Sequence, residues 1–171
     1  HQLVQETMNH ASDLAHDLAT LDFEENSLAK ALEGLATHAS TLFGITCKFK
    51  AEGPSPTLDS NAVRQLYKIA QESVTNAIKH GKAKKVGIQL DTRAQELRLT
   101  IQNNGMPFPD LKGRESGMGL RIMHYRTSLL NGTFEILGQG AKGTLVTCAV
   151  PLPEGGTEKS PSAPSLYSAG L

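Results

Sequence analysis

The sequence predicts an α+β domain, because helical and strand-like apolar patterns both occur within its 171 residues. From Val63 to Ile78, apolar residues recur at three- and four-residue steps, which is typical of a helix with one buried side. Two alternating runs, 85–90 and 96–102, flank a polar turn and favour an antiparallel hairpin. A chain of this length can hold one compact domain of about 100–150 residues plus appendages.

The N-terminal part of the chain predicts two helices. Gln2 to Leu21 carries apolar residues at coiled-coil or bundle spacing, so we expect a truncated helix that ends a longer hairpin or dimer stalk. The second helix is expected from Leu28 to Leu42, with Asn26 or Ser27 as N-cap and Gly44 at its end.

The middle of the chain predicts a strand, a loop and the main amphipathic helix. Residues 44–51 alternate like a strand, and residues 52–59 hold two prolines and a glycine, which favour a loop. The helix is expected over 65–82, with Asp59 or Ser60 as its cap.

The remaining elements complete a three-part organisation. They are, in order, the hairpin, a Pro- and Gly-containing loop at 106–116, a helix at 119–130 that ends at Asn131-Gly132, and strands at 133–137 and 144–150. Beyond Pro153 the chain is rich in Gly, Ser and Pro, which predicts a disordered tail. We therefore divide the chain into a helix and junction at 1–26, a domain at 27–153 and a tail at 154–171.

Composition limits the partners and the compartment. Seventeen basic and seventeen acidic residues give no net charge, and so no electrostatic reason to expect nucleic acid or an anionic membrane. No apolar run approaches the roughly 20 residues of a membrane span. Cys47 and Cys148 match no metal or disulfide spacing, so we expect two core cysteines on strands and a cytoplasmic location, including the cytoplasmic part of a membrane-anchored protein.

One face of the 65–82 helix carries Glu72, Asn76 and Lys79, with His80 close by. A solvated helix surface is the ordinary interpretation of such residues. The alternative is a magnesium site, because an Asn carbonyl oxygen and a Glu that holds a water suit this ion.

Two glycine-containing segments favour the second interpretation. Asn103-Asn104-Gly105 follows a strand, where a polar side chain can meet a base and the glycine permits close backbone approach. Gly117-Met118-Gly119-Leu120 opens a helix, where small residues and free N–H groups favour a polyphosphate. Each segment alone also fits an ordinary loop.

In this order and spacing, the three segments resemble the ATP-binding domain of sensor histidine kinases, in the GHKL superfamily that also holds gyrase and the heat-shock chaperones. The resemblance covers 44–151, with 72–80 similar to the N box, 103–105 to the first glycine box and 117–120 to the second. Gly143-Thr144 resembles the end-of-domain signature beside the adenine. The residues before 44 resemble the junction between dimerisation hairpin and kinase domain in the nitrate-sensor type.

This resemblance implies a two-layer α/β sandwich of the Bergerat type, with helices on one face of a mixed, mostly antiparallel sheet. The implied activity is a transferase: the γ-phosphoryl group of ATP passes to a histidine and then, in a phosphorelay, to an aspartate of a response regulator receiver domain. A homodimer through the helical hairpin is implied for the full-length protein, with no nucleic acid and no direct membrane contact of this chain.

The resemblance also implies a role for each matching residue. Asn76 would bind Mg²⁺ and Glu72 would support it through water or order the reacting groups, which makes both residues catalytic and metal-binding. The implied ATP contacts are Asn76, Lys79, His80, Asn103, Gly105, Gly117, Gly119, Leu120, Gly143 and Thr144.

Two positions depart from the family pattern at the adenine end. Asn103 stands where the family usually has Asp; it keeps one carbonyl acceptor, loses the charge, and can present its NH₂ instead. Pro107 replaces the second glycine of that box and stiffens the loop. Whether adenine selectivity is kept stays open.

The phosphoacceptor histidine is expected outside this chain. His16-Asp17 looks like an acceptor pair, but too few residues separate it from Asn76, and His10 fails for the same reason. We therefore expect the chain to bind ATP without phosphorylating itself. Two alternatives remain: a degenerate, non-catalytic nucleotide-binding scaffold, and a serine kinase of the anti-sigma type.

Overall fold

The computed structural model describes residues 27–109 and 117–153. Its elements are α2 (Ser27–Phe43), β1 (Thr46–Glu52), α3 (Ser60–Lys79), β2 (Lys85–Arg93), β3 (Glu96–Asn103), α4 (Met118–Ser128), β4 (Thr133–Gly138), the 3₁₀ turn η1 (Gly140–Lys142) and β5 (Thr144–Pro151). The helices and strands predicted within these ranges are confirmed, and η1 is an addition. The helix predicted at 2–21, the tail at 154–171 and most of the 106–116 loop lie outside the described residues.

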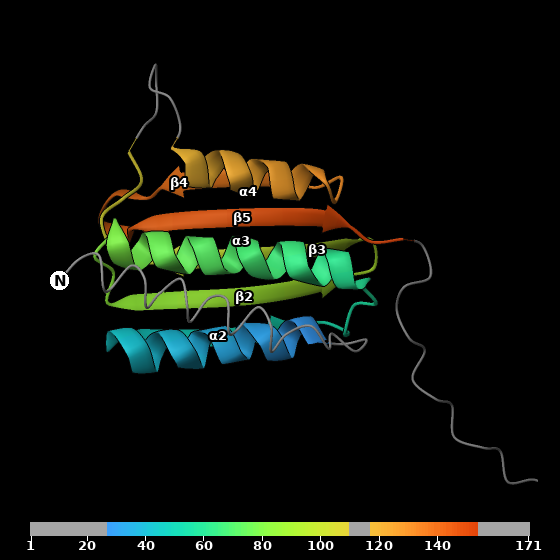
Figure 1. The fold of residues 1–171 in the computed structure, drawn as a ribbon, viewed down its shortest axis with the longest axis horizontal. Coiled ribbons are helices and arrows are strands. Elements are labelled where there is room, and N and C mark those ends of the chain that lie inside the picture. The colour runs from blue at the N-terminus through green and yellow to red at the C-terminus, as the bar shows by residue number, and fades with distance from the viewer. Residues whose placement is uncertain (1–26, 110–116, 154–171) are drawn as a thin grey trace, which may run out of the picture.

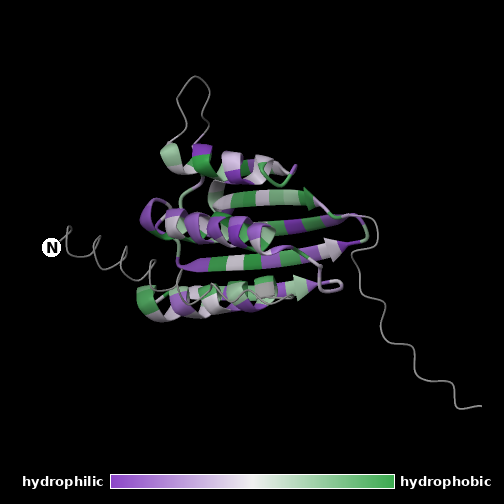
Figure 2. Cartoon of the chain, turned by 45° about the vertical axis from the view of Figure 1, so that its right-hand side comes forward, coloured by the Kyte–Doolittle hydropathy of each residue, from purple (hydrophilic) through white to green (hydrophobic). Residues whose placement is uncertain are grey.

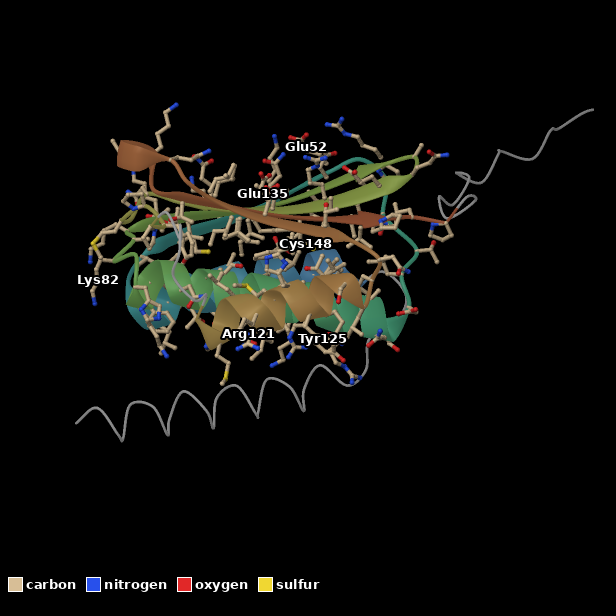
Figure 3. All side chains as sticks on the ribbon, turned by 90° about the horizontal axis from the view of Figure 1, so that it is seen from above. Glu52, Lys82, Arg121, Tyr125, Glu135 and Cys148 are labelled. Carbon is tan, nitrogen blue, oxygen red and sulfur yellow. The ribbon has the colours of Figure 1, made fainter. Side chains whose placement is uncertain are left out.

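Five strands form one mixed sheet in the order β1-β2-β3-β5-β4. β1 and β2 are parallel, since α3 provides the crossover between them, whereas every other neighbouring pair is antiparallel. In Figure 1 the three helices lie side by side in front of the strands, and Figure 3 shows them together on one face of the sheet. The predicted two-layer α+β architecture is therefore confirmed.

The alternation of buried and exposed residues along the strands explains why the described helices cover one face of the sheet. Buried and exposed residues alternate in β2 and β3, which appears in Figure 2 as alternating hydrophobic and hydrophilic bands. The register places Ile101 of β3 between Ile88 and Val146 on the helix side. In Figure 3, Glu52 and Glu135 lie on the opposite side of the sheet, away from the helices.

Both cysteines belong to the core, as predicted. Cys47 on β1 and Cys148 on β5 are buried free thiols. Burial raises the pKa of Cys47 to about 11, and burial also raises the pKa of Cys148, although its hydrogen bond with Thr127 opposes the change. Both side chains therefore stay as protonated, apolar-like groups at neutral pH.

α3 is the central helix, packed over β3 and β2 with α2 on one side and α4 on the other. Its predicted apolar stripe is buried, from Val63 and Leu66 to Val74 and Ala77. The side chain of Asp59 accepts a hydrogen bond from the Ala62 N–H at 2.7 Å, which confirms Asp59 as the N-cap.

The predicted end of this helix at Lys82 is wrong. The N–H groups of His80 and Gly81 both donate to the Asn76 carbonyl, at 2.9 and 3.0 Å, which closes the helix after Lys79. Lys82 then takes a positive φ of 53°, a conformation that stops further helical hydrogen bonding. His80 is therefore the C-cap of the helix and is exposed.

Replacing the cap tests how far α3 depends on Asp59. Asp59→Ala removes the oxygen that accepts from Ala62, so we expect the free energy of unfolding to fall by about 1 kcal/mol in urea titrations. Asp59→Asn is the matched control, because it keeps an oxygen acceptor, and it should lose less. Equal losses in the two variants would contradict this role of the cap.

Candidate functional site

A cavity of about 660 Å³ opens between α3, the first turn of α4 and the ends of β3 and β5. This volume lies within the range of small-molecule sites. Its lining consists of Glu72, Ser73, Asn76, Ala77, His80, Gly81, Asn103, Met106, Pro107, Phe108, Pro109, Gly117, Met118, Gly119, Leu120, Met123, Ile136, Thr144 and Val146. Segments far apart in the sequence therefore meet at one concave site.

Glu72 and Asn76 form the polar wall that α3 contributes. They are one helical turn apart, and the Asn76 Nδ2 donates to Glu72 Oε1 at 3.3 Å. The bond uses the side-chain NH₂ of Asn76, and it leaves the side-chain oxygen Oδ1 of Asn76 and the second carboxylate oxygen of Glu72 without a hydrogen bond among the described residues. Two oxygen ligands of different kinds are thus available at one place.

The oxygens of Asn76 and Glu72 suit magnesium better than a metal whose ligands all come from protein side chains. Among residues 27–109 and 117–153, no group of three or more His, Cys, Asp and Glu side chains could hold a metal ion. Magnesium usually takes one or two protein oxygens and completes its shell with water and substrate phosphates. Asn76 and Glu72 can supply that share.

The first turn of α4 forms the opposite wall. Gly117 is its N-cap, without a side-chain hydrogen bond, so the helix presents its first N–H groups with no capping side chain over them. A Cβ at Gly119 would lie 2.4 Å from Glu72 Oε1, whereas a Cβ at Gly117 would meet nothing within 4 Å. A side chain at 119 would therefore require the Glu72 carboxylate or the first turn of α4 to move.

Asn103 and Thr144 face each other across β3 and β5 at the inner end of the cavity. Both side chains are buried and hydrogen-bonded. Asn103 Oδ1 accepts from the Gly105 N–H at 2.9 Å, and the Thr144 hydroxyl donates to the Met106 carbonyl while it accepts from the Phe108 N–H at 2.8 Å. These bonds tie the start of the 104–109 loop to the sheet.

Two glycines make this tight corner possible. Gly143 has a φ of +85°, and a Cβ there would lie 2.1 Å from the Asn103 carbonyl oxygen. A Cβ at Gly105 would lie 2.2 Å from the Gly81 carbonyl oxygen. Neither glycine lines the cavity, but each permits a close backbone contact with a residue that does: Gly143 with Asn103, and Gly105 with Gly81.

The structure brings together most of the residues predicted from the sequence. Those that line the cavity are Glu72, Asn76, His80, Asn103, Gly117, Gly119, Leu120 and Thr144. Gly105 and Gly143 lie behind it, and Lys79 is exposed and outside the lining. The individual roles of these residues toward a ligand remain predictions.

Sequence reasoning missed the apolar part of the lining. Ser73 and Ala77 lie next to Glu72 and Asn76 on α3, so helical spacing could have indicated them. Ile136 and Val146 carried no such signal, because their place at the cavity depends on the order of strands in the sheet. Met123 is buried and Met118 is exposed, and both line the cavity.

Within the described residues, no helix has both the length and the apolar character needed to cross a membrane.

The cavity between α3 and α4 has the size of a small-molecule site, and comparison with known proteins identifies the family of the domain. The family model described as "Histidine kinase-, DNA gyrase B-, and HSP90-like ATPase" matches residues 61–154. This match extends over more than half of the chain and includes every segment that lines the cavity. The chain belongs to this ATPase family.

Two curated relatives are, by name, a sensor histidine kinase and a sensor protein. The chain is 34% identical to the sensor histidine kinase MctS of Rhizobium johnstonii, over 81% of this chain and 30% of that protein. It is 30% identical to the nitrate/nitrite sensor protein NarX of Escherichia coli K12, over 74% of this chain and 21% of that protein. The chain thus spans less than a third of either relative.

A solved structure establishes the same fold independently. The ATP binding domain of PrrB from Mycobacterium tuberculosis superimposes with a TM-score of 0.57 at 20% sequence identity, over 74% of this chain and 94% of that one. The resemblance to the histidine kinase ATP-binding domain, based on three short segments, is confirmed.

Proposed function

We propose that the cavity binds ATP together with Mg²⁺ and that this chain is the catalytic part of a sensor histidine kinase. The observation that supports this most strongly is the approach of α4 to Glu72 at Gly119, with Asn76 hydrogen-bonded to the same carboxylate. This arrangement puts a helix N-terminus, which attracts phosphate, beside two oxygen ligands for a hard cation.

The proposed roles of the residues follow from the different character of the two ends of the cavity. N–H groups at the start of α4, near Gly117 and Gly119, would bind the phosphates, and the apolar inner end near Asn103 would hold the base. Asn76 and Glu72 would hold Mg²⁺, which when bound neutralises phosphate charge. Positioning and charge neutralisation account for most of the catalysis expected in phosphoryl transfer, so no further acid or base in the chain is required.

Outside the cavity, the proposal extends to the partners of the whole protein. The relatives' names indicate a sensor histidine kinase and a sensor protein, so the phosphoryl group would pass from ATP to a histidine and then to an aspartate of a response regulator. We also infer a homodimer through a helical hairpin and a cytoplasmic location for this domain. His80, exposed at the end of α3, lines the cavity and would approach the phosphates.

Paired glycine variants test where the phosphates bind. Gly119→Ala places a methyl group against Glu72 Oε1, so the carboxylate or the first turn of α4 must move. We expect the Kd for ATP with Mg²⁺, measured by isothermal titration, to rise about tenfold or more. Gly34→Ala is the matched control, since Gly34 lies in α2 outside the cavity lining and its methyl group meets no atom within 4 Å, and it should keep nearly the original Kd. Equal effects of both variants would contradict the proposed phosphate position.

A labelling experiment tests the catalytic step. With γ-labelled ATP and Mg²⁺, we expect this chain to bind nucleotide but to acquire no acid-labile label, since His10 and His16, both outside the described residues, are not the predicted acceptors. Added acceptor hairpin from the full-length protein should become labelled. Acid-labile label on His16 would contradict the first expectation.

The same experiment separates the alternatives. A non-catalytic scaffold would bind ATP and leave the added hairpin unlabelled. A serine kinase would instead give an acid-stable label on a serine substrate. Glu72→Gln and Asn76→Ala should each remove the transfer if the proposed histidine kinase activity is correct.

A further inference from the structure

The inner end of the cavity has one polar side chain whose hydrogen-bonding direction is set by the protein itself. Asn103 is 7% exposed, ends β3 and lines the cavity. Its Oδ1 lies 2.9 Å from the Gly105 nitrogen. Because a backbone N–H can only donate, the amide oxygen must face Gly105, and the NH₂ group must be the other end of the amide.

This NH₂ group has no competing partner among the described residues. The Asn103 side chain makes no hydrogen bond in them other than the one with Gly105. An amide cannot turn over without placing NH₂ against the Gly105 N–H, so the orientation is held by donor–donor repulsion. The corner is also rigid, because Gly105 and Gly143 pack against backbone atoms of Gly81 and Asn103.

The neighbouring donors at this end of the cavity are already used. The Thr144 hydroxyl donates to the Met106 carbonyl, and the Ser73 hydroxyl donates to the Ile69 carbonyl at 2.7 Å. The N–H groups of Met106 and Phe108 donate to Gly81 and Thr144, and Pro107 has none. Apart from the exposed ring of His80, the Asn103 NH₂ is therefore the side-chain donor that this end offers to a ligand.

The surroundings of Asn103 suit the flat face of a base. Val146 lies two residues beyond Thr144 on the same face of β5, and Ile136 is its partner on β4. Both line the cavity together with Met106 and Met123. A planar ring between apolar side chains would present its edge to the one donor group in their midst.

We propose that Asn103 selects the base of the nucleotide by donating a hydrogen bond to it, an inference that rests on the proposed function. The cavity then favours a purine nucleotide with an oxygen acceptor at position 6. In this proposal position 6 of the purine faces Asn103, where the amino group of adenine is a donor and would meet the donor NH₂ of Asn103. A 6-oxopurine such as hypoxanthine or guanine carries a carbonyl oxygen and matches it. The cavity thus accepts 6-oxopurine nucleoside triphosphates at least as well as ATP.

ATP and ITP form the most direct pair of probes, because their bases differ at position 6 and in the proton on N1. Isothermal titration with Mg²⁺ should give a Kd for ITP no higher than the Kd for ATP. Asn103→Asp replaces the donor by a carboxylate acceptor, so it should shift the ratio of the two Kd values toward ATP by about tenfold or more. The oxygen that accepts from Gly105 is kept in this variant.

Asn104→Asp is the matched control for the change of charge. Asn104 lies outside the cavity lining, and its Oδ1 accepts from the N–H groups of Lys84 and Lys85 at 3.0 and 2.8 Å. This variant should keep the original ratio of Kd values. A wild-type protein that binds ATP tenfold more tightly than ITP, or an unchanged ratio in Asn103→Asp, overturns the inference and leaves the proposed function intact. Failure of the wild-type protein to bind either nucleotide overturns both.

Discussion

The contact between the first turn of α4 and Glu72 of α3 is the constraint on which the cavity depends. Gly119 has only a hydrogen atom at the position where a Cβ would lie 2.4 Å from Glu72 Oε1. The same carboxylate is hydrogen-bonded to Asn76, so the start of α4, the acid and the amide are fixed relative to one another. A wider separation of the two helices would leave these groups too far apart to act on one phosphate chain.

The sheet supports this contact by the way in which it holds α3. The apolar stripe of α3 packs over β3 and β2, and its polar side is thereby directed toward α4. β3 ends at Asn103 and β5 begins at Thr144, so the sheet also provides the inner wall of the cavity. α3 thus contributes both to the core and to the cavity, where the buried Ser73 and Ala77 lie beside Glu72 and Asn76 in the lining.

Local patterns predicted much of this arrangement. The apolar spacing of α3, the cap at Asp59 and the glycines before α4 all act within a few residues, so they are visible in the sequence. The position of Lys79 was less predictable, because helical angles alone could not show where the cavity ends. The contribution of Ile136 and the orientation of the Asn103 amide depend on strand order and on the Gly105 N–H, which only the folded chain brings together.

The central claim is that a nucleotide occupies the space between α3 and α4, with its phosphates at the start of α4. Titration of ¹⁵N-labelled protein with ATP and Mg²⁺, followed by NMR, tests it most directly. The largest shift changes are expected at the backbone amides of Gly117 and Gly119 and at the side-chain amides of Asn76 and Asn103. Changes confined to the uncovered face of the sheet, around Glu52 and Glu135, would contradict the claim.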